Sequence, residues 1–285
     1  MRNASLTAFG IRCILALFPS VLSDQNSLFL KMKKLILTAF SLATAFAAHA
    51  QLQPAKQTPE SSELWSPVPR VVTPGKSSSA VSGFTAPSDA IILFDGKNLD
   101  AWVSGKDGKS AAPWTVADGT MTVAPKSGDI QTKQTFGDYQ LHIEWRTPAK
   151  VDGNGQGRGN SGIFMQGIYE LQVLDSYNNP TYSNGQAGSI YKQTMPLVNA
   201  SVGPGEWQTY DVVYTAPHFN KDGQMTIPPY ITVIHNGVLV QNHTMIQGTT
   251  PYIGQPTIEP HGKGPIKLQD HNNTTSFRNV WIREL

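Results

Sequence analysis

Residues 90–285 consist of short β-prone runs separated by turn residues, and this pattern limits what the chain can fold into. Asn236-Gly237 lies between the alternating runs "ITVIH" and "VLVQ", and Asp118-Gly119 lies in the same way inside "VADGTMTV". An Asn-Gly or Asp-Gly pair in such a setting is the strongest short-range sign of a β-hairpin. No segment shows a helical period of useful length. The sequence therefore predicts one all-β domain, a sandwich or jelly roll of antiparallel strands.

The first 50 residues are expected to be a leader outside this fold. Met32 begins "MKKLILTAFSLATAFAAHA", with two lysines, an apolar run and a small-x-small ending. That is the pattern of a cleaved secretory signal, and it is too short for a membrane span. We expect residues 1–31 to be an upstream extension, the alternative being a genuine long N-terminal region. The mature chain would then begin near Gln51, be exported to the periplasm or the medium, and contain no membrane span.

Charge and cysteine content narrow the set of partners. The single cysteine, Cys13, lies in the leader, so the mature chain would lack disulfides and depend on a large core. The leader holds five of the 22 basic and one of the 20 acidic residues, so removing it changes the net charge from +2 to −2, with 17 basic against 19 acidic residues. A nearly neutral chain favours neither nucleic acid nor an anionic membrane as a partner.

Residues 51–88 are rich in Pro, Ser, Thr and Lys, which predicts a linker or a strap lying on the domain. Within this stretch "ELWSPVPRVV" carries Trp65, through which the strap could dock. The jelly-roll domain itself is expected over residues 89–285.

Three predicted strands carry a set of polar side chains on one face. Side chains alternate between the two faces of a strand, so every second residue points the same way. Such a face either meets water or binds a hydroxylated ligand. The polar sets are His142, Glu144 and Arg146 in "YQLHIEWR", Glu170 and Gln172 in "YELQV", and Lys267, Gln269 and His271 in "IKLQDH".

The closing run "FRNVWIREL" is the last predicted strand. Alternation from Phe277 predicts that Phe277 and Trp281 belong to the core. Arg278 and Asn279 are then expected to make polar contacts.

Seven motifs follow one another along the domain. They are "LFDGKNLDAW" (93–102), "PWTVADGTMTV" (113–123), "GNSGIFMQGIYELQVLDS" (159–176), "GSIYKQTMP" (188–196), "GEWQTYDVVY" (205–214), "HNGVLVQN" (235–242) and "GPIKLQDHNNTTSFRNVWIREL" (264–285). In this order they resemble the 3-keto-disaccharide hydrolase domain family, formerly DUF1080. The resemblance implies a concanavalin- or laminarinase-like jelly roll of two antiparallel sheets, with the ligand on a concave sheet face. It also implies cleavage of glycosides already oxidised to a ketone at C3 of the sugar.

The chemistry that this resemblance implies begins at the ketone. A C3 carbonyl acidifies the hydrogen at C2, so a general base can form an enediolate and the C1 group can leave by β-elimination. Addition of water then gives net hydrolysis. The site needs a base, a donor or cation for the enolate oxygen, and an acid for the leaving oxygen. No redox cofactor is needed, because a partner sugar 3-oxidoreductase would make the ketone. A divalent metal such as Ca²⁺ stays open, since loop carboxylates and carbonyls leave no readable motif.

Glu170 is the first candidate for acid-base chemistry, with His271 as a proton shuttle or metal ligand and Glu144 as a further carboxylate. Glu144 and Arg146 could instead form a cross-strand ion pair of small value. Asp175 falls on the face opposite Glu170, which argues against an ordinary retaining glycosidase on this strand. The expected substrate-binding residues are Arg146, Asn160, Ser161, Gln166, Gln172, Tyr191 and Gln269.

Two other classes of function use the same features. A non-catalytic carbohydrate-binding module would present the same polar sheet face. An accessory domain would use its Pro-rich strap to recruit a partner. Catalysis predicts that replacing the base abolishes turnover while sugar binding survives.

Overall fold

A computed structural model describes residues 57–71 and 86–285, and the predicted signal peptide lies outside these residues. The compact unit begins at Gln57, so the strap residues 57–71 belong to the same unit as the domain. The fold is all-β, as predicted. In the described part of the chain the helical turns are three short 3₁₀ turns, and no helix there is long and apolar enough to cross a membrane. The 3₁₀ turns are η1 (Pro59–Ser62), η2 (Gly155–Gly157) and η3 (Ser183–Gly185).

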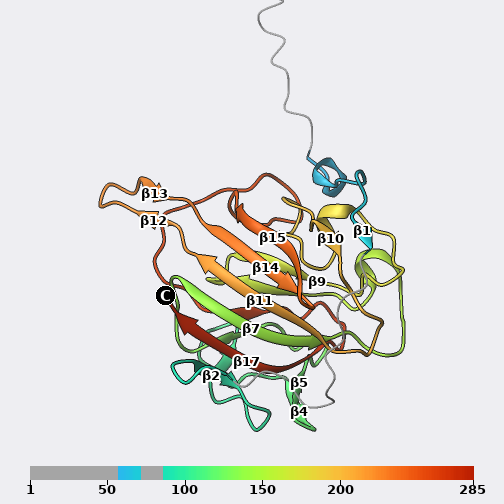
Figure 1. Cartoon of the computed structure of the whole chain (residues 1–285). Coiled ribbons are helices and arrows are strands. Elements are labelled where there is room, and N and C mark those ends of the chain that lie inside the picture. Colours follow the sequence, from blue (N-terminus) through green and yellow to red (C-terminus); the bar gives the residue numbers. More distant parts are fainter. Residues whose placement is uncertain (1–56, 72–85) are drawn as a thin grey trace, which may run out of the picture. The chain divides into compact units, whose positions relative to one another are not determined.

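The larger of two antiparallel sheets has eight strands. Figure 1 shows most of its strands side by side, from β15 to β17. Their order is β15 (Val238–Met245), β14 (Tyr230–His235), β11 (Gln208–Thr215), β7 (Tyr139–Arg146), β17 (Ser276–Glu284), β5 (Thr120–Thr122) and β4 (Thr115–Ala117), and β2 (Ile91–Phe94) pairs with β17.

The smaller sheet has five strands and lies across the core from the larger one. Two short pairs complete the fold, of which the parallel pair joins the strap to the domain. The order of the smaller sheet is β3 (Trp102–Ser104), β6 (Ile130–Thr132), β16 (Lys267–Leu268), β8 (Ser161–Met165) and β9 (Tyr169–Val173). The short pairs are β1 (Arg70–Val71) with β10 (Val198–Asn199) and β12 (His218–Phe219) with β13 (Met225–Ile227).

Both predicted hairpins are present. Asn236 and Gly237 join β14 to β15 with φ values of 51° and 77°, and Asp118 and Gly119 join β4 to β5 with 49° and 72°. Positive φ at both central residues is the geometry of the type I′ turn, which suits Asn, Asp and Gly. Local turn chemistry therefore sets the register of these two strand pairs.

The core fills the space between the two sheets and is rich in aromatic residues. Two tyrosines of β11 cross it to reach the β8–β9 hairpin. Tyr210 Oη donates to the Gln172 carbonyl oxygen at 2.8 Å, and Tyr214 Oη donates to Gln166 Oε1 at 2.7 Å. Buried phenol groups need such partners, so these bonds link the sheets at defined points. The largest fully buried side chains include Trp102, Trp145, Tyr139, Tyr169, Tyr210, Tyr214, Phe136 and Phe277.

A β-bulge interrupts the alternation of β17. Arg278 and Trp281 pair with β7 residues that are two positions apart, so Asn279 and Val280 stand opposite a single residue. Asn279 has a φ of 46°, in the left-handed region that Asn tolerates better than most residues. One extra residue inverts the faces of all residues that follow it.

The bulge makes the prediction for Trp281 wrong. Phe277 lies in the core as predicted, and so do Val280 and Ile282. Trp281 instead lies on the outer face of the larger sheet, where its ring stacks on the His142 ring with 5.3 Å between centroids. An alternation counted from Phe277 cannot anticipate this change, because the bulge depends on pairing with β7.

A buried charged network covers the centre of that outer face. Glu144 accepts hydrogen bonds from Arg278 Nε at 2.6 Å and Asn279 Nδ2 at 2.9 Å, and His142 Nδ1 lies 2.7 Å from Asp211 Oδ1. Burial alone would raise the pKa of Glu144, but its hydrogen-bond partners lower the pKa to about 2. Burial alone would lower the pKa of His142, but its two carboxylate partners raise the pKa to about 9. The network is therefore charged at neutral pH and satisfied by its own members.

Replacing Glu144 with Ala should reduce the free energy of unfolding by about 1–3 kcal/mol, because Arg278 and Asn279 lose their buried acceptor, whereas His142 keeps Asp211. Arg283→Ala, which breaks the exposed pair with Asp89, is the matched control and should cost less than about 1 kcal/mol. Urea unfolding at pH 6 measures both values. Equal losses in the two variants would contradict the assignment of a buried, stabilising network.

Candidate functional site

Glu170 lies on the outer face of the smaller sheet, next to the place where β8 lacks a side chain. Tyr169, Leu171 and Val173 of the same strand face the core, as predicted. A Cβ added at Gly162 would overlap Glu170 Oε1, so glycine leaves the space that the carboxylate occupies. The neighbouring wall is the ring of Phe164, whose residue pairs directly with Glu170.

The Glu170 carboxylate is buried without a hydrogen-bond partner among the described residues. Only 5% of the residue is exposed. Burial raises its pKa to about 8, against an opposing effect of the Lys267 cation and a smaller contribution from Asp129 in the same direction as burial. Lys267 Nζ lies 4.2 Å from the centre of the Phe164 ring and 3.6 Å from Asp129 Oδ2. A buried carboxyl group with a strongly shifted pKa beside a cation is typical of functional sites.

Three predicted binding residues share this part of the molecule, and the side-chain amides of Gln172 and Asn160 already donate to the protein, although Gln172 Oε1 has no partner among the described residues. Gln172 Nε2 donates to Asn160 Oδ1 at 3.3 Å and to Gln156 Oε1 at 3.2 Å, and all of Gln172 is buried. Asn160 Nδ2 donates to the Gln156 carbonyl oxygen at 2.7 Å. Gln269 lies beside Gly162, to which its main-chain N–H donates, and its Oε1 is buried without a partner. Gln172 and Asn160 thus hold the η2 loop over the sheet.

Two other predicted binding residues bind main chain or core groups. Ser161 Oγ donates to the Gln269 carbonyl oxygen at 2.7 Å and is fully buried. Gln166 occupies the β8–β9 turn with a φ of 52°, donates to the Gly262 carbonyl oxygen and accepts from Tyr214. Both side chains are therefore used by internal hydrogen bonds and do not contribute to the outer face of the smaller sheet.

Glu144 and Arg146 do not share a site with Glu170. Both lie on β7 in the larger sheet and face away from the core, as Glu170 does on the opposite sheet. The core therefore separates them, and the grouping of Glu144 with Glu170 is wrong. The polar residues of β7 have their own partners, and Arg146 stacks on the Trp207 ring at 4.7 Å. Alternation correctly predicted which side chains of β7 and β9 face outward, but it did not predict that the two strands belong to different sheets.

His271 lies in the exposed loop after β16, two residues beyond Gln269. Its carbonyl oxygen accepts from Asn273 Nδ2 at 2.9 Å, while its ring has no hydrogen bond or ion pair within residues 57–71 and 86–285. No contact joins His271 to Glu170, so its role as a proton shuttle stays a prediction.

Tyr191 lies in the segment that hydrogen-bonds along the outer edge of β9, beside Glu170. Its main-chain N–H donates to the Glu170 carbonyl oxygen at 3.1 Å, and its Oη lies 2.9 Å from Tyr182 Oη. Burial raises the pKa of Tyr191 to about 12, so the phenol keeps its proton at neutral pH. It can therefore donate a hydrogen bond beside the carboxylate.

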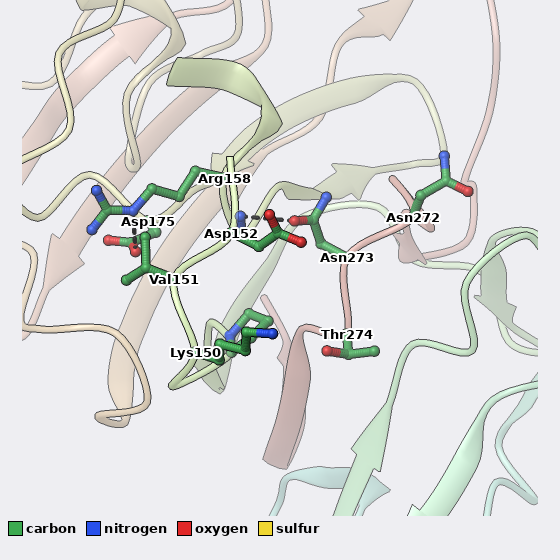
Figure 2. Close-up of a pocket in the computed structure, with 10 residues that line it drawn as sticks. Lys150, Val151, Asp152, Arg158, Asp175, Asn272, Asn273 and Thr274 are labelled. Carbon is green, nitrogen blue, oxygen red and sulfur yellow. Dashed lines mark hydrogen bonds and ion pairs between the residues drawn. The ribbon is translucent and has the colours of Figure 1, made fainter. Parts of the chain in front are cut away.

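A hollow lined by Lys150, Asp152, Arg158, Asp175 and Asn273 lies near the end of β9, away from Glu170. Figure 2 shows its charged and amide side chains, and its volume is about 280 Å³. Arg158 Nε donates to Asp175 Oδ2 at 2.7 Å, and Asn273 Oδ1 accepts from the Gly159 N–H at 2.9 Å. These groups bind one another, whereas the Glu170 carboxylate does not have a partner. We therefore place the candidate site at Glu170 and not in this hollow.

The described residues contain no side-chain cluster typical of a metal site. Among residues 57–71 and 86–285, no three His, Cys, Asp or Glu side chains gather in a group that could hold an ion. A Ca²⁺ site that also uses main-chain carbonyl oxygens stays a prediction without assigned residues.

Comparison with known proteins identifies the family. The sequence matches the 3-keto-alpha-glucoside-1,2-lyase-like domain over residues 89–283. The chain belongs to this family. It is similar to the crystal structure, at 2.13 Å, of a candidate glycosyl hydrolase from Parabacteroides distasonis ATCC 8503, with 60% identity and a TM-score of 0.70, covering 80% of this chain and 97% of that one.

Two more distant solved structures are also similar to this chain. A second candidate glycosyl hydrolase from the same organism, at 1.70 Å, has 21% identity and a TM-score of 0.49, covering 69% of this chain and 94% of that one. The carbohydrate-binding module CBM66 from Bacillus subtilis has 11% identity and a TM-score of 0.37, covering 65% and 96%. No curated protein matches the chain.

Sequence reasoning missed three residues that surround Glu170. Lys267 lies on a predicted polar face but is not among the predicted site residues, and neither are Phe164 and Gly162. The register of β8 with β9 and of β16 with β8 brings the three together. The "GNSG" motif was the one available signal, because its second glycine is Gly162.

Replacing Glu170 with Gln should flatten the pH dependence of stability. An unfolded Glu ionises near pH 4.5 and the folded one near 8, so between these values the native state binds more protons. Stability of the wild type then falls by up to about 1.4 kcal/mol per pH unit as pH rises through this window, and the variant lacks this loss. Urea unfolding at pH 5, 6.5 and 8 measures the difference. Parallel curves for the two proteins would contradict a raised pKa at Glu170.

Proposed function

We propose that this protein cleaves 3-keto-glycosides on the outer face of the smaller sheet, with Glu170 as the general base. The buried, unpartnered Glu170 carboxylate beside the Lys267 cation is the observation that carries the proposal. A base with a pKa of about 8 retains more proton affinity than an ordinary carboxylate, which suits removal of a hydrogen from carbon. Membership of the 3-keto-alpha-glucoside-1,2-lyase-like family supports a ketone at C3 of the substrate.

The proposed reaction assigns one task to each group around Glu170. Ionised Glu170 takes the C2 proton, and the electron pair moves into the C2–C3 bond while the C3 oxygen gains negative charge. Lys267 stabilises that charge, since a fixed cation in a water-poor site interacts strongly with a developing anion. The enolate electrons then form the C1–C2 double bond as the bond from C1 to the leaving oxygen breaks. The leaving oxygen takes a proton from the Tyr191 phenol, which is protonated at neutral pH, and water returns a proton to Tyr191 as Glu170 gives up the one it took. Lyase and hydrolase outcomes share these steps and differ in whether water adds to the product.

We further infer that the substrate is made by a sugar 3-oxidoreductase, since no step here creates the ketone. Export through the signal at residues 32–50 is part of the same proposal. Amino-terminal sequencing of protein secreted by a bacterial host should begin near Gln51. An intact leader on all of the recovered protein would contradict export.

The direct test follows release of the aglycone from a 3-keto-glucoside and from its unoxidised parent, with and without chelator. We expect release from the keto form only, with kcat/KM rising with pH up to about 8 as Glu170 ionises. Glu170→Gln should reduce kcat/KM by about 10²–10⁴-fold, the usual contribution of a general base. Gly162→Ala should reduce it by about 10²-fold, because the added methyl group displaces the carboxylate.

Gly157→Ala is the matched control, because a Cβ there meets no atom within 4 Å and its activity should stay unchanged. Glu144→Gln should also keep its activity as long as the protein folds, since it lies across the core. Full activity in Glu170→Gln would remove Glu170 from the reaction.

A non-catalytic sugar-binding surface is the second candidate function. It is favoured by exposed aromatic side chains at the edge of the site, such as Trp65 and Tyr252. Release of aglycone from neither substrate, together with measurable sugar binding, would support this candidate and exclude the enzyme.

A further inference from the structure

The strap of residues 57–71 is fixed to the domain by buried polar side chains. Asn184 accepts from the Leu64 N–H at 3.0 Å and donates to the Ser62 carbonyl oxygen at 3.0 Å. Ser183 Oγ donates to the Pro67 carbonyl oxygen at 2.7 Å. Asn184 and Ser183 are both fully buried, so the strap docks through main-chain groups and has a defined position.

Lys192 adds a third attachment from the loop that follows Tyr191. Its Nζ donates to the carbonyl oxygens of Pro59 at 2.5 Å and Tyr252 at 2.9 Å, and it lies 3.8 Å from Glu63 Oε1. This one ammonium group joins the strap, the Tyr191 loop and the loop around Tyr252. All three segments therefore meet beside the Glu170 face.

Aromatic rings lead from Glu170 to the strap. Tyr191 hydrogen-bonds Tyr182, and the edge of Tyr182 packs against Trp65 with 6.3 Å between ring centroids. Tyr252 lies over the Lys192 ammonium at 4.7 Å from its ring centre. Trp65 and Tyr252 nevertheless remain 60% and 61% exposed, although the segments that carry them are anchored. Large aromatic side chains held in place but exposed are suited to binding.

A small polar hollow lies between the strap and the Tyr252 loop. Its volume is about 80 Å³, and Ser62, Tyr191, Lys192 and Gln255 are among its lining residues. Ser62 Oγ is buried without a hydrogen-bond partner in the described residues. Hydroxyl and amide groups beside exposed rings fit a sugar, which has polar edges and apolar ring faces. A purely apolar ligand would leave Ser62 unsatisfied.

We propose that Trp65 and Tyr252 form a second subsite, which binds the neighbouring sugar ring of a disaccharide or longer glycan. This inference rests on the proposed function, which places the first sugar ring at Glu170. One ring lies over the Gly162–Phe164 floor, and the next stacks on the anchored aromatic side chains with its hydroxyl groups toward Ser62. The strap is thus a part of the binding surface that selects substrates of more than one ring.

The test measures binding of unoxidised sugars by calorimetry, which does not depend on turnover. The probes are methyl glucoside, with one ring, and maltose and cellobiose, with two rings in α and β linkage. The wild type should bind at least one disaccharide about tenfold more tightly than methyl glucoside, a difference of about 1.4 kcal/mol. Trp65→Ala should remove that preference and leave the affinity for methyl glucoside unchanged.

Val68→Ala is the matched control, because Val68 is exposed on the same strap and should alter neither affinity. Urea unfolding checks that both variants keep the strap attached. The proposal is wrong if neither disaccharide binds more tightly than methyl glucoside, or if Trp65→Ala weakens all three probes equally.

Turnover of the 3-keto forms of maltose and cellobiose is measured in parallel and judges the proposed function separately. A disaccharide preference without turnover rejects catalysis and keeps the subsite. Turnover without a disaccharide preference keeps catalysis and rejects the subsite.

Discussion

The contact between the Glu170 carboxylate and the bare backbone of Gly162 is the feature on which the candidate site depends. A side chain at position 162 would fill the space that the carboxylate now occupies. Burial in that space, without a hydrogen-bond donor among the described residues, raises the pKa of Glu170 to about 8. Burying this carboxyl group without a donor costs free energy of folding, which packing in the rest of the core must offset. A functional role for Glu170 would explain why the protein keeps such a residue.

Glu144 shows what a buried glutamate looks like when it serves stability. It too lies on an outward sheet face, yet its hydrogen-bond partners lower its pKa to about 2. Arg278 and Asn279 reach it because the bulge in β17 turns two successive side chains toward β7. The two carboxylates have the same chemistry and similar burial, and the difference in their partners moves their pKa values in opposite directions. Partners, and not burial alone, therefore distinguish the candidate carboxyl group from the structural one.

Local sequence patterns predicted the all-β fold, both hairpins and the outward face of the polar residues on β7 and β9. These features depend on neighbouring residues, such as Asn236-Gly237 and the alternation of "YELQV". The patterns could not place β7 and β9 in different sheets, because that choice depends on pairing between distant strands. They also could not reveal the bulge at Asn279, which requires β7 as a template. The Lys267 cation was missed for the same reason, since β16 reaches Glu170 only through its pairing with β8.

The strap shows how a segment with the composition of a linker can become part of a folded surface. It contributes few apolar side chains to the core, so hydrophobic burial does not hold it. Its main-chain carbonyl and N–H groups instead satisfy Asn184, Ser183 and Lys192, which are buried polar groups that would otherwise lack partners. The dependence is mutual, because these side chains fix the backbone of the strap, which few other contacts hold in one conformation. Trp65 packs against Tyr182 yet stays 60% exposed in this arrangement, which leaves it available to a ligand.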